Sequence, residues 1–172
     1  MKEQITTSHF SITLITLILG LVFIASSCQQ TDRETASSQN EDLAMQYIEA
    51  YNAQDIDALQ AVLADRIKMY GEEHEPDFLL EMIRGAWGAF PDITLDPTAI
   101  VGSDDYVTVR LMVTGTGTGE FLGHDIDGKE FRVTETILFG VTDGHISEYS
   151  YNWDELGFWT QLGVVESPYP VE

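Results

Sequence analysis

Glu135 is the residue of this sequence with the most obvious capacity for acid/base chemistry. The residues at alternate positions around it are all apolar, namely Phe131, Val133, Ile137 and Phe139. A β-strand here would therefore place one carboxyl group on an otherwise apolar face. Burying an unpaired carboxylate raises its pKa, which favours proton exchange near neutral pH. We expect Glu135 to be a general base or polar anchor, or else to form a structural ion pair with Arg110.

Asp154 is the second acidic candidate, and it directly follows Trp153. The same position suits the N-cap of a terminal helix, where a carboxylate accepts backbone N–H hydrogen bonds. Tyr149 and Tyr151 alternate with Trp153, so one strand face would carry all three rings. Their phenol groups could donate to the carbonyl oxygen of a ligand, or they could form an aromatic cluster with hydroxyls at its rim.

No metal site and no cofactor are expected. His124, Asp125 and Asp127 could ligate a cation, but no second ligand cluster is visible. The Asp127-Gly128 pair indicates instead that this segment is a turn. The single cysteine, Cys28, excludes an intrachain disulfide and a cysteine-based zinc site.

The first half of the chain has helical spacing. Expected elements are helices over residues 41–51 and 56–63, a brief strand over 67–70, and a third helix over 76–89. Asn40 and Asp55 are candidate N-caps, Pro76 suits the first turn of the third helix, and the Phe90-Pro91 pair ends it. These helices carry four side chains that are core residues or, in a hollow fold, ligand contacts: Tyr47, Tyr51, Met82 and Trp87.

The second half alternates with the period of β-strands. Expected elements are strands over residues 106–114, 131–141 and 146–153, followed by a short helix over 154–162. Asp127-Gly128 and Asp143-Gly144 are hairpin-turn signals, because such turns favour residues that tolerate positive φ. The order predicts an α+β fold, in which three N-terminal helices pack on one face of a strongly curved antiparallel sheet.

The N-terminus has the layout of a secretory signal peptide. An uncharged, largely apolar run over residues 10–24 leads to Ala25-Ser26-Ser27 and then Cys28. This junction resembles a bacterial lipobox, although Ala25 stands where leucine is usual. We expect Cys28 to be lipidated and the protein to be secreted across the inner membrane, facing the periplasm or the cell surface. The alternative is an uncleaved N-terminal anchor or a core helix.

The charge balance argues against nucleic acid as a partner. Eight basic residues stand against 29 acidic ones, giving a formal net charge of −21. Nucleic acid is therefore not an expected partner, because phosphate contacts need cations. The expected organisation is a signal peptide over 1–27, a flexible tether over 28–40, a domain over 41–163 and a tail over 164–172.

Several stretches together resemble the SnoaL-like polyketide cyclase family, also called ester cyclases, of the NTF2-like superfamily. They are Ala50–Leu59, Ala89–Asp92, Gly115–Gly123, Asp143–Glu148, Trp153–Gly157 and Gln161–Gly163. The resemblance implies a conical α+β barrel around an apolar pocket. It also implies ring closure by an intramolecular aldol reaction without a cofactor, using an aspartate from a His-Trp-Asp triplet.

The sequence departs from the family pattern at the residues for this chemistry. The triplet falls on Tyr149-Ser150-Tyr151, so Tyr151 takes the aspartate position. Gly117 replaces the histidine of the Gly-Thr-His motif, and Ile137 occupies the polar position that often faces the triplet.

The expected function is binding of a small hydrophobic molecule in an internal pocket, with cofactor-free cyclase, isomerase or hydrolase chemistry as the enzymatic form. Catalytic candidates are Glu135, Asp154 and Tyr151. Candidate ligand-binding residues are Tyr149, Arg110, Tyr47, Tyr51, Trp87, Met82 and Ile137. The alternative is a non-catalytic binding module, or a homodimer formed through the open face of the sheet.

Overall fold

The computed structural model describes residues 35–167. Cys28 and the predicted signal peptide lie outside this range, as do most of the predicted tether and the end of the predicted tail. Of the described residues, 37–167 form one compact unit, and the fold below is that of this unit. Within residues 35–167 no helix combines the length and the apolar character needed to cross a membrane.

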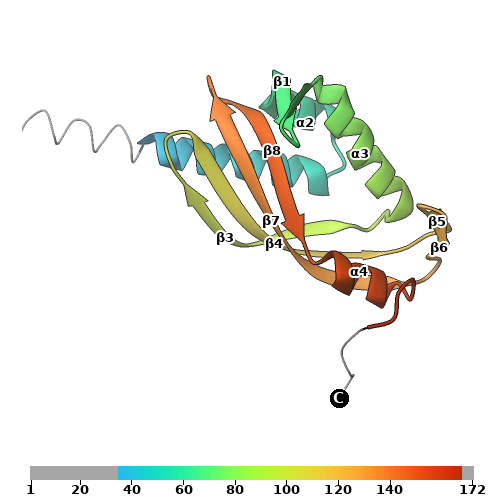
Figure 1. The fold of residues 1–172 in the computed structure, drawn as a ribbon. Coiled ribbons are helices and arrows are strands. Elements are labelled where there is room, and N and C mark those ends of the chain that lie inside the picture. The colour runs from blue at the N-terminus through green and yellow to red at the C-terminus, as the bar shows by residue number, and fades with distance from the viewer. Residues whose placement is uncertain (1–34, 168–172) are drawn as a thin grey trace, which may run out of the picture. The chain divides into compact units, whose positions relative to one another are not determined.

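A six-stranded sheet with the order β2-β1-β8-β7-β4-β3 forms the centre of the unit (Figure 1). Its strands are β1 (Leu63–Met69), β2 (Glu72–His74), β3 (Thr94–Gly102), β4 (Tyr106–Thr116), β7 (Glu130–Thr142) and β8 (His145–Trp153). A separate ribbon consists of β5 (Glu120–Phe121) and β6 (His124–Asp125). All neighbouring strands pair antiparallel except β1 and β8, which run parallel. The predicted α+β fold with a curved, mainly antiparallel sheet is therefore confirmed.

The helices follow the predicted order. The first covers residues 37–52 of the unit, and then come α2 (Ile56–Val62), α3 (Pro76–Ala89) and α4 (Glu155–Gln161). Asp55 caps α2 as expected, because its side chain accepts a hydrogen bond of 3.0 Å from the backbone N–H of Ala58. Pro76 occupies the first turn of α3, where its missing N–H has no helical partner in any case.

Asn40 was expected to cap the first helix, and this prediction is wrong. The chain is already helical at residue 37, so Asn40 lies inside the helix and is buried. Its Nδ2 donates 2.7 Å to the backbone oxygen of Ser103, in the turn between β3 and β4. A tertiary contact thus uses the side chain that local capping rules would assign to the helix end.

The long strands were predicted well and the edge strands were not. Strands β4, β7 and β8 extend the predicted ranges by a residue or two at their ends. By contrast, β1 is longer than the expected strand over 67–70, and β2 and β3 had no predicted bounds. Pro97 interrupts the pattern of β3, and the pairing with β4 shifts register between Pro97 and Ala99. Proline lacks an N–H donor and is tolerated at such an edge position.

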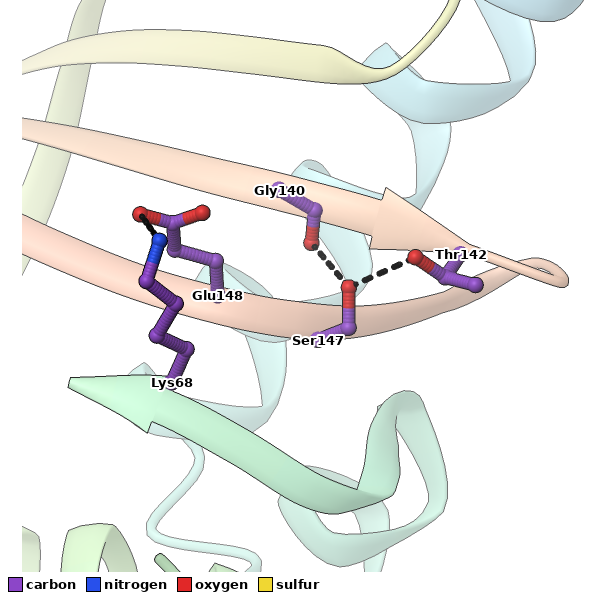
Figure 2. A network of polar contacts seen from close by, with 5 residues as sticks. All are labelled: Lys68, Gly140, Thr142, Ser147 and Glu148. Atoms are coloured by element: carbon purple, nitrogen blue, oxygen red, sulfur yellow. Dashed lines mark hydrogen bonds and ion pairs between the residues drawn. The ribbon is translucent and has the colours of Figure 1, made fainter. Parts of the chain in front are cut away.

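Polar contacts link β1, β8 and β7 (Figure 2). Lys68 Nζ lies 3.5 Å from Glu148 Oε1, and the two residues are also partners in the parallel β1–β8 pair. Ser147 Oγ donates to the Gly140 backbone oxygen and lies 2.9 Å from Thr142 Oγ1. A Cβ at residue 140 would come within 2.8 Å of Glu148 Cβ, so this close approach of β7 and β8 requires glycine.

The structure tests the two predicted hairpin turns, Asp127-Gly128 and Asp143-Gly144. Asp143 and Gly144 both have positive φ, at 51° and 74°, and they join β7 to β8 as predicted. Asp127-Gly128 forms a turn, but it does not join a hairpin, because β6 pairs with β5 and β7 pairs with β4. The hairpin prediction at Asp127-Gly128 is therefore wrong, since the β5–β6 ribbon interrupts the expected hairpin.

Candidate functional site

Glu135 lies in the middle of β7, on the face of the sheet that the helices cover. Its cross-strand partners are Leu111 of β4 and Trp153 of β8. The same face of β7 carries four buried side chains: Phe131, Val133, Ile137 and Phe139. We call this the inner face, because Tyr47 of the first helix packs on Phe139 with 5.0 Å between ring centroids. The predicted placement of Glu135 on an apolar face is confirmed.

Four tyrosines lie near the Glu135 carboxyl group. Tyr47 and Tyr51 come from the helix over residues 37–52, while Tyr149 and Tyr151 come from β8. The ring of Tyr149 lies 6.0 Å from that of Tyr47 and 5.6 Å from that of Tyr151. All four phenol groups interact electrostatically with Glu135. We refer to these five residues as the Glu135 cluster.

Two buried hydrogen-bond donors at the Glu135 cluster lack an acceptor in regular geometry. Trp87 of α3 packs edge-on against Tyr51, with ring centroids 5.5 Å apart. Among residues 35–167, its Nε1 has no hydrogen-bond partner, and the Tyr47 hydroxyl meets only the Tyr149 hydroxyl, outside regular hydrogen-bond geometry. Buried polar groups are paired in the large majority of cases, either with protein or with ordered water. These two donors therefore favour a water molecule or a polar ligand atom on the inner face.

Burial controls the electrostatics of the cluster. It raises the pKa of Glu135 from its ordinary value of 4.5 to about 7, because water no longer stabilises the carboxylate. Within the described residues, the Glu135 side chain makes no hydrogen bond or ion pair that would offset this effect. Burial likewise raises the pKa of Tyr47, Tyr51 and Tyr149, so these phenols stay protonated and act as donors.

The expected ion pair between Glu135 and Arg110 is wrong. Arg110 pairs with Thr136, whereas Glu135 pairs with Leu111, one position further along β4. Adjacent residues of a strand point to opposite faces. Arg110 is accordingly exposed on the outer face of the sheet, and it does not line the inner face as the ligand-binding prediction required.

The other candidate ligand residues divide between the core and the surface. Ile137 is buried on the inner face and pairs with Tyr151. Met82 is 37% exposed, because α3 turns Leu79, Ile83 and Trp87 inward instead. The prediction that Met82 lines a ligand site on the inner face is therefore wrong.

Asp154 acts as the N-cap of α4. Its Oδ1 accepts a hydrogen bond of 2.9 Å from the backbone N–H of Gly157, and the residue is exposed. A Cβ at residue 157 would overlap with the Asp154 carboxylate, so the glycine makes room for the cap. The capping interpretation of Asp154 is confirmed, and its carboxylate is engaged away from the Glu135 cluster.

Asp154→Ala is expected to lower the free energy of unfolding by about 1 kcal/mol, because it removes the capping acceptor. Asp154→Asn retains an oxygen at the same position and should cost much less. Chemical denaturation of both variants measures the difference. Equal losses in the two variants would contradict the capping role.

Two open hollows lie apart from the Glu135 cluster. One, of about 480 Å³, is lined by Asp92, Thr114, Gly115, Thr116, Glu130, Phe131, Arg132 and Gln161. The other, of about 440 Å³, is lined by Leu63, Ala64, Asp65, Arg66, Thr142, Asp143, His145 and Ser147. Neither lining includes Glu135 or one of the four tyrosines. In the described part of the chain no group of three or more His, Cys, Asp and Glu side chains could hold a metal ion.

Sequence reasoning missed Tyr70, whose hydroxyl donates to the Tyr151 hydroxyl over 2.8 Å. Tyr70 lies in the turn between β1 and β2, whereas the sequence pattern predicted it at the end of a strand over 67–70. No signal in the sequence links a turn residue to a strand position 81 residues later.

The fold and the order of motifs agree with comparisons to known proteins. A sequence model of the SnoaL-like polyketide cyclase family matches residues 41–162. The chain therefore belongs to the SnoaL-like polyketide cyclase family, which has the NTF2-like fold. A search of curated proteins finds no match.

Several solved structures have this fold, and many of them are named as candidate polyketide cyclases. IdmH of Streptomyces antibioticus, a candidate polyketide cyclase, is 28% identical, with a TM-score of 0.65 over 73% of this chain and 99% of IdmH. TsrD of Streptomyces laurentii is 24% identical, with a TM-score of 0.68 over 74% of this chain and 97% of TsrD. AclR of Streptomyces galilaeus, a candidate hydroxylase, is 21% identical, with a TM-score of 0.69 over 76% of this chain and 89% of AclR.

Proposed function

We propose that this domain binds a small hydrophobic molecule on the inner face of the sheet, and that Glu135 exchanges a proton with it. The observation that carries the proposal is the partly buried Glu135 carboxyl group on the otherwise apolar inner face, which has no ionic partner among the described residues and a pKa raised to about 7. A carboxyl group of this kind populates both protonation states at neutral pH, as a general acid/base requires.

The surrounding donors suit chemistry at a carbonyl group. A carboxylate at Glu135 would remove a proton from the carbon next to a carbonyl, leaving an enolate. The enolate oxygen would accept hydrogen bonds from the Tyr47 hydroxyl and from the unpartnered Trp87 N–H. In a cyclisation, the enolate carbon would form a bond to a second carbonyl carbon, and the resulting alkoxide would take the proton back from Glu135. This sequence of steps needs no cofactor.

The position of the carboxyl group differs from the family pattern that the sequence resembles. Tyr151 occupies the aspartate position and pairs with Ile137, so β8 supplies a phenol there. Glu135 lies one strand away, opposite Trp153, and is diagonal to Tyr151 on the same face. We infer that β7 supplies the acid/base group in this protein. IdmH, the candidate polyketide cyclase at 28% identity, supports a cyclisation as the reaction.

Hydrogen–deuterium exchange of β-tetralone, a small apolar ketone with acidic C–H bonds, tests the proposal without knowledge of the substrate. The purified protein in D₂O should accelerate loss of the α-proton signal in NMR spectra. The rate should rise with pH and level off with an inflection near 7, because only the Glu135 carboxylate removes a proton. A rate equal to the buffer background, or one without this inflection, would contradict the proposal.

The second candidate function is a non-catalytic ligand-binding or dimerisation module. Tyr151 at the family's aspartate position favours it, since a phenol with a raised pKa is a poor base at neutral pH. Saturable binding of β-tetralone combined with background exchange would support a binding module. A mass of twice the chain in light scattering would support a homodimer.

We also propose, from the sequence, that Cys28 carries the lipid anchor of a secreted protein. The protein would then be anchored to a bacterial membrane and face the periplasm or the cell surface. The part of the expected tether before residue 37 would connect the anchor to the domain, and the acidic domain would have little electrostatic attraction to anionic headgroups.

Cys28→Ser is expected to release the protein from the membrane, because several acyl chains contribute about 0.8 kcal/mol per buried methylene. Detergent phase partitioning of the wild-type and variant proteins measures this. Retention of Cys28→Ser in the detergent phase would indicate an uncleaved N-terminal anchor instead.

A further inference from the structure

Tyr70 occupies a position where tyrosine is a poor choice for the local backbone. It forms the tip of the β1–β2 hairpin with Gly71, and the two residues have φ of 53° and 84°. Two-residue hairpin turns of this kind favour asparagine, aspartate or glycine, because other residues are strained at positive φ. Tyr70 is also 68% exposed, so burial of its ring does little to offset the strain. Strained residues of this kind cluster at functional sites.

The contact that Tyr70 does make leads directly to the Glu135 cluster. Its hydroxyl donates 2.8 Å to the hydroxyl of Tyr151, and the two rings meet edge-on with centroids 6.2 Å apart. Tyr151 is half-buried, lies diagonal to Glu135 on the inner face and interacts with it electrostatically. Either phenol can donate in a hydroxyl–hydroxyl contact, and in the arrangement where Tyr70 donates, the Tyr151 proton is available for a ligand.

The sheet holds the hairpin tip in this place. β1 runs parallel to β8, with Lys68 and Glu148 as register partners that also form an ion pair (Figure 2). Tyr70 follows Lys68 by two residues, and Tyr151 follows Glu148 by three. The register that pairs Lys68 with Glu148 therefore brings the tip of the hairpin beside Tyr151.

We propose that Tyr70 is a positioning residue of the candidate site, which orients the Tyr151 hydroxyl toward a ligand bound beside Glu135. The inference rests on the proposed function, and it adds the β1–β2 hairpin to the site. A ligand oxygen would then receive a hydrogen bond from Tyr151 at the rim, in addition to those from the buried donors. Tyr70 itself need not touch the ligand.

The test compares Tyr70→Phe with Tyr106→Phe in the β-tetralone exchange assay. Tyr106 is a 44% exposed tyrosine of β4 and serves as the matched control. Tyr70→Phe keeps the ring and removes the donor, so kcat for exchange should fall about fivefold, as for the loss of one hydrogen bond. KM should change little, and the inflection near pH 7 should remain, because Glu135 is untouched. Tyr106→Phe should match the wild type.

A double-mutant cycle separates positioning from a general structural role. In a Tyr151→Phe background, Tyr70→Phe should cause no further loss of kcat, because Tyr70 acts through the Tyr151 hydroxyl. A rate for Tyr70→Phe equal to that of Tyr106→Phe would overturn the inference while leaving the proposed function intact. So would an equal loss with and without the Tyr151 hydroxyl. Background exchange by the wild-type protein would overturn both proposals together.

Discussion

Glu135→Gln is expected to reduce the exchange rate of β-tetralone about 100-fold or more, which is the usual contribution of a positioned general base. Glutamine preserves the size and polarity of the side chain and cannot accept the proton. The hydroxyl donors of Tyr47 and its neighbours would remain, so some acceleration over buffer should persist through stabilisation of the enolate. The pH inflection near 7 should disappear with the carboxyl group.

Glu130→Gln is the matched control for this experiment. Glu130 begins the same strand and is exposed, so the substitution makes the same chemical change outside the cluster. Its rate should equal that of the wild type. If Glu135→Gln and Glu130→Gln both retain full activity, Glu135 is not the base. The catalytic proposal would then be wrong even though the exchange activity exists.

Glu135→Gln is also expected to stabilise the fold at alkaline pH. Between pH 4.5 and about 7, native Glu135 retains a proton that the unfolded chain has released. The free energy of unfolding of the wild type should therefore fall as pH rises through this window, and stay lower above it. The shift corresponds to about 3 kcal/mol, the cost of an ionised carboxylate on the inner face.

Urea denaturation of the two proteins at pH 4 and pH 8 measures this effect. The stabilities should be similar at pH 4, where both side chains are neutral, and Glu135→Gln should be more stable by about 3 kcal/mol at pH 8. The difference between proteins cancels the titration of the many other carboxylates. A variant that is no more stable than the wild type at pH 8 would show that the ionised Glu135 carboxylate does not destabilise the fold.

The face of the sheet that carries the site could be predicted from alternation alone. Strand periodicity placed Glu135 among apolar side chains and put Tyr149 and Tyr151 together on one face, and the structure confirms both. The Asp143-Gly144 turn then set the pairing of β7 and β8. These predictions succeeded because they depend on local geometry, which a strand repeats every two residues.

Contacts between elements were predicted less well. Arg110 was offered as a partner for Glu135 although register decides which residues meet across strands, and register was not visible in the sequence. Met82 has helical spacing with apolar residues of α3 such as Leu79, yet the docking of α3 turned it outward. Asn40 is a good local cap that a tertiary contact with Ser103 recruits instead. In each case packing between distant segments decided the outcome.

The most direct test of the account is the ionisation of Glu135 itself. Carbon-13-labelled glutamate allows the side-chain carboxyl signals to be followed by NMR as pH changes, and the signal absent from Glu135→Gln identifies Glu135. The account predicts a midpoint of about 7 for this signal. A midpoint near 4.5 would mean that the carboxyl group is solvated like an ordinary surface glutamate, and would contradict a proton-exchanging site on the inner face.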